Sequence, residues 1–301
     1  MGPDPDCWPA AALGRHQLCA VRSRSDDVGY GTALPARHAS LLTRSKSTLA
    51  DPGAFVRDND TVVLRYVLSN GTVFSTESHD EGTTWSAPTE ASQPAGRKCG
   101  SAWPKPFGSN EVVIPCAGGS ARSTDGGRTW LASTKNVTLD PNVTGLGETI
   151  ISADGRSPRS LTMFIRAGSH DGWLTHAVAL SDDGGDTWGA ARLMHIVGAT
   201  CEGSVGRDSA APPGQVLLAA PSGHVPFRLG RGNMSVYTLD TATPGAEPVS
   251  RLDVWPNAAG YSDFAQAKSG QMLLLFEGGG SVCAVARRSN QWREPPLLGF
   301  R

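Results

Sequence analysis

Short runs of apolar and β-branched residues, each bounded by turn-forming residues, recur along most of the chain. They lie at residues 61–68, 72–76, 111–115, 160–165, 174–180, 215–220, 234–239, 271–276 and 282–286. Each run has five to eight residues, which is the usual length of a β-strand and is short for a helix. The pattern therefore predicts a protein of many short strands.

One octet recurs three times between these runs, at residues 78–85, 123–130 and 181–188. Its shared pattern is Ser-x-Asp-x-Gly-x-Thr-Trp, and successive Trp residues are 45 and 58 positions apart. In a tight turn an Asp side chain binds backbone N–H groups, and a Gly adopts a positive φ. The Trp offers a large apolar face that can be buried against a neighbouring unit. The octet therefore predicts a repeated hairpin turn.

Units of about 40–50 residues with three or four short strands each are typical of β-propeller blades. Five such units follow one another from residue 51 onward. Residues 1–48, with one apolar run at 17–21, would form a sixth, degenerate or truncated blade. Because no linker or change of composition divides the chain, we predict an all-β, six-bladed β-propeller in which residues 1–301 form a single domain.

The composition agrees with this prediction and excludes some classes of function. The 36 Gly and 21 Pro residues make up 57 of 301 positions, or 19%, against about 12% in an average soluble chain. The 27 basic and 28 acidic residues balance, so no excess of positive charge indicates nucleic acid or an acidic membrane surface. No apolar stretch approaches the roughly 20 residues of a membrane span. Residues 1–6 have no signal-peptide pattern, and the sequence assigns no compartment.

Neither a metal nor a cofactor is expected. The six Cys residues show no metal-binding spacing, and the sequence has no HExxH, P-loop or three-glycine dinucleotide motif. One or two disulfides and buried free thiols both remain open for the Cys residues.

The octets resemble the Asp boxes of sialidases (exo-α-neuraminidases), and the flanking segments extend the resemblance to nearly the whole chain. Residues 51–58 with 82–88 resemble the second blade of that family, and residues 112–115 resemble its third. Residues 255–264, with Gly260-Tyr-Ser262, and residues 274–277, with Phe276-Glu277, resemble its last blade. The last pair of motifs is the more specific, since other secreted propellers also have Asp boxes. The resemblance implies exo-hydrolysis of terminal sialic acid from glycoproteins, glycolipids or oligosaccharides.

The chemistry of a sialoside explains which residues such an enzyme needs. The substrate has a carboxylate on its anomeric carbon, and sialidases use a Tyr nucleophile where most glycosidases use a carboxylate. A neutral phenol is not repelled by the substrate's charge. Free Tyr has a pKa near 10, so it needs an adjacent base. The substrate carboxylate in turn needs a cluster of Arg residues.

The nucleophile, its base and one Arg are assigned through the resemblance. Of the four Tyr residues, Tyr261 alone lies in the family's nucleophile context, although a Tyr that fills the propeller channel is the alternative. Glu148, within residues 145–155, resembles the base. Arg166, 18 residues further on, resembles an Arg that binds the substrate carboxylate.

Two further positions belong to the predicted substrate-binding set. Residues 224–235 resemble the family's Arg-x-Asn-Leu-Thr motif, and the match falls on Arg231, with Arg228 as the alternative. Glu277 matches a carboxylate that in the family orients an Arg of the cluster. The alternative for Glu277 is a charged residue at a strand end.

The first blade departs from the family's pattern. Sialidases begin with an Arg-Ile-Pro segment, whereas here no Arg precedes Pro9. Residues 18–29 still resemble the loop that holds the acid/base, which makes Asp27 the best match and Asp26 the alternative, with Arg22 or Arg24 as an accessory Arg. A solvated loop of mixed charge is the other interpretation. The loss of one Arg of three lowers transition-state binding by about one to two decades.

Two other functions fit the same residues. A lectin-like propeller would bind sialylated glycans without cleaving them, and a trans-sialidase would transfer the sugar to another glycan. The partner in every case is a sialylated glycan, and the sequence leaves the oligomeric state open.

Overall fold

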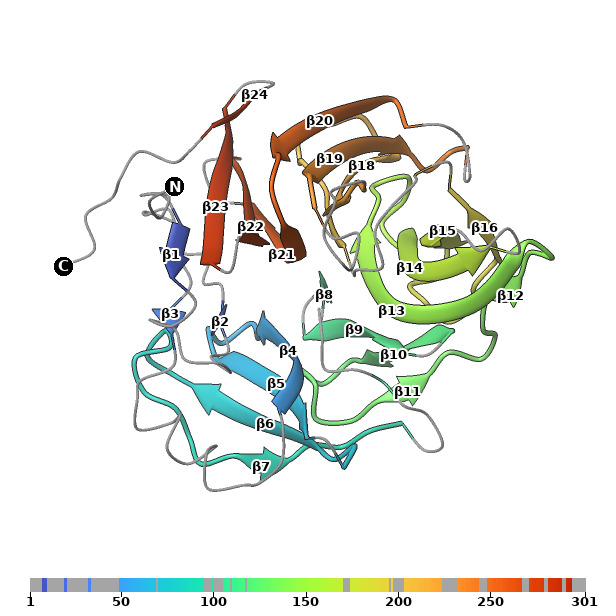
Figure 1. The fold of residues 1–301 in the computed structure, drawn as a ribbon. Coiled ribbons are helices and arrows are strands. Elements are labelled where there is room, and N and C mark those ends of the chain that lie inside the picture. The colour runs from blue at the N-terminus through green and yellow to red at the C-terminus, as the bar shows by residue number, and fades with distance from the viewer. Residues whose placement is uncertain are drawn as a thin grey trace.

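The computed structural model describes residues 7–9, 19–20, 32–33, 49–68, 70–94, 99, 105–108, 110–116, 118–169, 174–194, 196, 203–223, 232–243, 248–266, 271–278, 281–288 and 291–293. Their strands form six small sheets placed around a ring, as Figure 1 shows. The all-β, propeller-like arrangement predicted from the sequence is therefore confirmed. No helix in the described part of the chain is long and apolar enough to cross a membrane.

The first three sheets follow in chain order. The two-stranded sheet pairs β2 (Cys19–Ala20) with β3 (Thr32–Ala33). The next sheet contains β4 (Leu49–Val56), β5 (Val62–Leu68), β6 (Val73–Ser78) and β7 (Thr89–Glu90). The third contains β8 (Lys105–Gly108), β9 (Glu111–Cys116), β10 (Gly119–Ser123) and β11 (Leu131–Ala132).

The other three sheets are larger or equal in size. The fourth contains β12 (Thr138–Leu139), β13 (Val143–Ala153), β14 (Leu161–Ser169), β15 (Leu174–Ser181) and β16 (Ala190–Leu193). The fifth contains β17 (Ser204–Gly206), β18 (Gln215–Pro221), β19 (Met234–Asp240) and β20 (Ser250–Trp255). The last contains β1 (Cys7–Pro9), β21 (Ala259–Gln266), β22 (Met272–Gly278), β23 (Ser281–Arg288) and β24 (Gln291–Arg293).

The inner strands of the five large sheets, β4, β8, β13, β17 and β21, contact one another in turn around the ring. Strand β4 contacts β8, β8 contacts β13, β13 contacts β17, and β17 contacts β21. Within each sheet the following strands then run outward as an antiparallel meander, with β12 added in parallel to β16. Residues at matching positions of the inner strands therefore come together although they are far apart in sequence.

The apolar core lies between neighbouring sheets. Phe55 and Val63 of one sheet pack in a buried cluster with Val112 and Ile114 of the next. Equivalent clusters join the fourth sheet to the fifth and the fifth to the last. Because the third, fourth and fifth sheets each pack on both sides in this way, the apolar strand runs of the sequence become the walls between these blades. All nine runs predicted as strands from residue 61 onward lie in strands.

The described residues do not form the six blades predicted, of which the first was expected to be degenerate or truncated. Three sheets have four strands and two have five, whereas the sheet formed by β2 and β3 has only two. Strand β1 lies within the residues predicted as the first blade, but it pairs with β23 in the last sheet (Figure 1). The physical reason lies in the sequence of residues 1–48, which has one short apolar run and no octet to close a hairpin.

The octet turn is held by its own side chains. In the second octet, Asp125 Oδ1 accepts hydrogen bonds from Ser123 Oγ at 2.7 Å and from Thr129 N at 2.9 Å. Thr129 Oγ1 donates to Asp125 Oδ2 at 2.7 Å, and Gly127 N donates to Ser123 Oγ at 2.7 Å. Gly127 has a φ of 82°. The octets at 78–85 and 181–188 repeat these contacts, as predicted.

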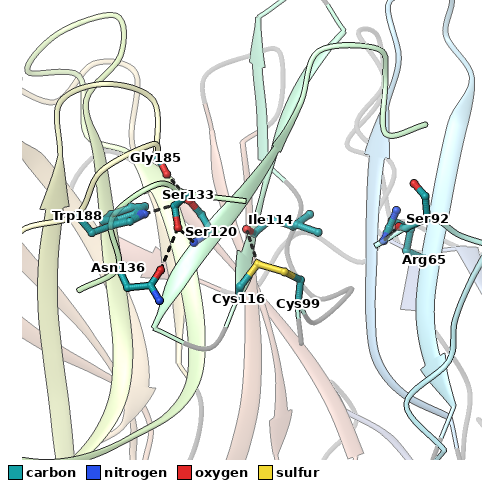
Figure 2. The surroundings of a disulfide bond; sticks show 10 residues. All are labelled: Arg65, Ser92, Cys99, Ile114, Cys116, Ser120, Ser133, Asn136, Gly185 and Trp188. Atoms are coloured by element: carbon teal, nitrogen blue, oxygen red, sulfur yellow. Dashed lines mark hydrogen bonds between the residues drawn. A yellow bond between two sulfur atoms is a disulfide. The ribbon is translucent and has the colours of Figure 1, made fainter. Parts of the chain in front are cut away.

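The octet Trp residues anchor the turns in different ways. Trp130 Nε1 donates to Gly127 O at 3.2 Å within its own turn, and its ring packs against Phe55 of the preceding sheet. Trp188 is 1% exposed and donates instead to Ser120 Oγ of the preceding sheet at 3.0 Å, while the same hydroxyl donates to Gly185 O at 2.6 Å (Figure 2). The predicted burial of the Trp against the neighbouring unit is correct for these two turns.

A disulfide joins Cys99 to Cys116, the last residue of β9 (Figure 2). Both residues are 3% exposed. Of the two alternatives left open for the Cys residues, disulfide or free thiol, this pair is a disulfide.

Candidate functional site

Strand β13 positions Glu148 through a β-bulge. Leu146 pairs with Ala167 and Thr149 pairs with Ile165, so Gly147 and Glu148 together lie opposite the single residue Arg166. A bulge turns a side chain out of the regular alternation of the strand. A Cβ at Gly147 would lie 3.1 Å from Arg166 O, so only a glycine fits there without displacing the neighbouring strand.

Strand β21 positions Tyr261 in the same way. Ala259 pairs with Gly278 and Ser262 pairs with Phe276, so Gly260 and Tyr261 lie opposite Glu277. Both inner strands thus place a glycine and a functional residue opposite one charged residue of the second strand. This matching placement aims two side chains from different blades at the same central region.

The three residues assigned as nucleophile, base and arginine come together. Tyr261 Oη donates a hydrogen bond to Glu148 Oε1 at 3.0 Å, and Arg166 Nη1 donates to Glu148 Oε2 at 2.6 Å. The side chains of Arg166 and Glu148 are 29% and 32% exposed, and Tyr261 is half-buried. A ligand can therefore reach the group, in contrast to the fully buried Trp188.

This arrangement can activate the phenol. The Glu148 carboxylate accepts from the Tyr261 hydroxyl, so it is placed to take the phenolic proton as the oxygen attacks. Arg166 holds the other carboxylate oxygen, which fixes the orientation of Glu148.

Glu277 contacts the backbone of Tyr261, and the Arg-orienting role that the resemblance implies for it stays a prediction. Its Oε2 accepts a hydrogen bond from the backbone N–H of Tyr261 at 3.2 Å, and its side chain is exposed. Among the described residues, no Arg forms an ion pair with Glu277.

The remaining predicted site residues lie outside the described residues. These are Asp27 and its alternative Asp26, Arg231 and its alternative Arg228, and the accessory Arg22 and Arg24. Their roles stay predictions.

One position that the sequence analysis did not name shares the geometry of Glu148 and Tyr261. In β4, Ala50 pairs with Val67 and Gly53 pairs with Arg65, so Asp51 and Pro52 form a third bulge, opposite Tyr66. The inner strand of a third blade thus interrupts its register with an acidic residue on the bulge. The Asp-Pro-Gly run at 51–53 is the signal in the sequence, since Pro and Gly favour irregular strand positions.

No known protein family and no curated protein matches the sequence. The fold, however, resembles solved structures that include sialidases. A Hadza microbial sialidase, Hz136, is 17% identical with a TM-score of 0.59, over 81% of this chain and 53% of that one. NanB sialidase from Streptococcus pneumoniae is 16% identical with a TM-score of 0.55, over 79% of this chain and 41% of that one. A leech intramolecular trans-sialidase is 23% identical with a TM-score of 0.53, over 72% of this chain and 36% of that one.

These identities establish the fold alone. The chain spans between 36% and 53% of the length of these solved structures.

Proposed function

We propose that the protein is a retaining exo-α-sialidase that releases terminal sialic acid from glycans, with Tyr261 as nucleophile and Glu148 as its base. The observation that carries this proposal is the hydrogen bond of 3.0 Å between Tyr261 Oη and Glu148 Oε1. The two residues are 113 positions apart and belong to different sheets, so no local turn accounts for their contact. The likeness of the fold to sialidases supports the same reading.

The reaction proceeds in two steps. The Tyr261 oxygen bonds to the anomeric carbon while the bond to the leaving oxygen breaks, and the phenolic proton passes to Glu148. Asp27 is the proposed acid that protonates the leaving oxygen. Water then attacks the glycosyl-tyrosine intermediate with Asp27 as base, Tyr261 recovers its proton, and the sugar leaves with its configuration retained.

Binding of the substrate falls to the arginines. Arg166 pairs with the proposed base Glu148 and its side chain is 29% exposed, so its guanidinium can bind the sugar carboxylate as well as orient Glu148. Arg231 is the proposed second arginine.

A lectin-like propeller is the second candidate, and one observation favours it. Among the described residues, the sheet formed by β2 and β3 has only two strands. No Arg precedes Pro9, where sialidases have the Arg of their Arg-Ile-Pro segment. A binding module needs the arginines without a complete catalytic set.

The test is turnover of a fluorogenic α-sialoside by the wild-type chain and by Tyr261→Phe. The variant is expected to lose at least about a thousandfold in kcat and to keep its affinity for a carboxylate-bearing sialic acid analogue, because only the attacking oxygen is removed. Tyr237→Phe, at a buried position in β19, is the matched control and should retain turnover.

The outcomes separate the candidates. Equal turnover by wild type and Tyr261→Phe contradicts the nucleophile. No turnover by wild type, with the analogue still bound, supports the binding module. Proton NMR of the first product distinguishes hydrolysis from transfer, since hydrolysis with retention releases the α-anomer of sialic acid.

A further inference from the structure

The bulge in β21 changes what the Tyr261 backbone binds. In a regular antiparallel pair, strand N–H groups donate to carbonyl oxygens of the partner strand. Here Gly260 and Tyr261 lie outside the paired register of β21 and β22. The Tyr261 N–H donates to the Glu277 carboxylate at 3.2 Å, so a side chain holds the bulged residue in the sheet.

Gly260 makes room for this carboxylate. A Cβ at Gly260 would overlap Glu277 Oε2, which shows that the carboxylate lies directly against the Gly260 backbone. The φ of Gly260 is not among the positive values of the described residues, so the backbone there does not itself require a glycine. The glycine is needed for the space that Glu277 occupies.

The matching bulge in β13 is built differently. A Cβ at Gly147 would contact the backbone oxygen of Arg166 at 3.1 Å and two atoms of its side chain at 3.4 Å. The charged residue opposite that bulge, Arg166, bonds to the functional side chain of Glu148. The charged residue opposite the β21 bulge bonds to the functional residue's backbone instead.

We infer that Glu277 is a positioning residue, which binds the Tyr261 N–H and thereby holds the Tyr261 phenol within reach of Glu148. This inference rests on the proposed role of Tyr261 and departs from the Arg-orienting role that the resemblance implies for Glu277. The direction of a side chain follows from the backbone that carries it, and a misplacement of about 1 Å lowers a rate by up to about a hundredfold.

Three variants separate the hydrogen bond from the charge. Glu277→Ala removes the acceptor, Glu277→Gln keeps an acceptor oxygen without the charge, and Gly260→Ala displaces the carboxylate without deleting it. Glu277→Ala and Gly260→Ala are expected to lower kcat by about 10–100-fold with KM within about threefold. Glu277→Gln is expected to recover most of that loss. The double variant Gly260→Ala/Glu277→Ala should lose no more than either single variant, since both break one contact.

Two controls accompany these measurements. Glu90→Ala, at an exposed glutamate of the outermost strand β7, should leave kcat and KM unchanged. Hydrogen exchange of the Tyr261 amide gives a readout that needs no turnover, because loss of its acceptor speeds exchange. Faster exchange is expected in Glu277→Ala and not in Glu277→Gln.

Opposite results would overturn the inference without touching the proposed reaction. If Glu277→Gln and Glu277→Ala lower kcat/KM equally, and do so through a higher KM, then Glu277 acts through its charge on an arginine. If Glu277→Ala keeps wild-type kcat while Tyr261→Phe is inactive, the nucleophile stands and the positioning role is wrong. If the wild-type chain shows no turnover, the proposed reaction fails, and unchanged exchange of the Tyr261 amide in Glu277→Ala would overturn the positioning role as well.

Discussion

The octet turns and the Tyr261 site are built on different principles, and only the third octet shares a sheet with a residue of the site, Glu148. Leu161 pairs with both Ala153 and Ser181, so the third octet begins beside the last residue of β13, while Glu148 is the central residue of that strand. Hydrogen bonds between residues of the same octet hold its turn. The site is held by a hydrogen bond between Tyr261 and Glu148, which are 113 positions apart in the sequence.

This difference separates the residues that stabilise the fold from those that carry the proposed reaction. An octet needs only its own Ser, Asp, Gly and Thr, so it can be repeated in blade after blade. The site needs two blades in a fixed relative position, and the side chains of Glu148 and Arg166 stay 32% and 29% exposed. We therefore expect substitutions at the octets to change unfolding and substitutions at the site to change turnover.

The largest effect is expected for Glu148→Gln. The amide cannot accept the phenolic proton, so kcat should fall by about 10²–10⁴-fold on the proposed mechanism. The thermal midpoint should change little, because the group is partly exposed. Turnover and a thermal melt of the same preparation measure both, with Glu90→Gln as control. Wild-type turnover would place the base elsewhere.

Asp183→Ala tests the octet turn at residues 181–188. It removes hydrogen bonds from Thr187 N, Thr187 Oγ1 and Ser181 Oγ, and we expect the free energy of unfolding to fall by about 2–3 kcal/mol. Urea unfolding measures this change, and KM should not move.

The neighbouring Asp182 provides the matched control for this variant. Its side chain is 76% exposed and pairs with Arg156 at the surface, so Asp182→Ala should cost less than about 1 kcal/mol. Equal losses at the two positions would show that the octet hydrogen bonds do not stabilise the turn.

Acid should weaken the octets. Hydrogen bonds from the Thr84 side chain and backbone lower the pKa of Asp80 to about 2. Burial raises the pKa of Asp125, but hydrogen bonds from Thr129 outweigh it and lower that pKa to about 2 as well. Because the unfolded pKa is near 3.9, this stabilisation is complete above that pH and is lost as the pH falls toward 2.

The measurement is the free energy of unfolding between pH 2 and pH 6. Asp125→Asn should be less stable than wild type at pH 6, and the two curves should converge at pH 2. Parallel curves would contradict the assignment of this pH dependence to Asp125.

The smallest effect is expected at the one octet that departs from the others. Glu81 has a φ of 63° where the other two octets have Gly126 at 70° and Gly184 at 79°. A side chain in this region strains the backbone, so Glu81→Gly should raise the free energy of unfolding by up to about 1 kcal/mol. Urea unfolding detects such a gain.

Gly126→Ala is the reciprocal control and should destabilise the fold. Its Cβ would lie 2.9 Å from Arg57 Cδ, in addition to the strain at a φ of 70°. A gain in stability in this variant would contradict the argument for Glu81.

The sequence predicts the octets and strands well because their signals are local. The Asp, Gly and Thr of each turn bind one another, and each apolar run fills its own strand. The site residues Tyr261, Glu148 and Arg166 were predicted through resemblance, and the structure brings them together.

The means by which they meet could not be predicted. The bulges at Gly147 and Gly260 leave no distinct pattern of apolar and polar positions, because a bulge shifts register between two strands that the sequence does not align. The bond between Glu277 and the Tyr261 backbone depends on the same shift. The first blade was predicted to be degenerate or truncated because residues 1–48 have no octet.

The pairing of β1 with β23 has a consequence for the order in which the protein is made. The sheet that carries Tyr261 includes Cys7–Pro9, which leave the ribosome early, and Ser281–Arg288, which leave it late. The octet turns can form as soon as each has been synthesised, since domains and turns fold as their residues emerge. The sheet that carries Tyr261 is completed only when β23 has been made, so a nascent chain has all three octets before this sheet can be complete.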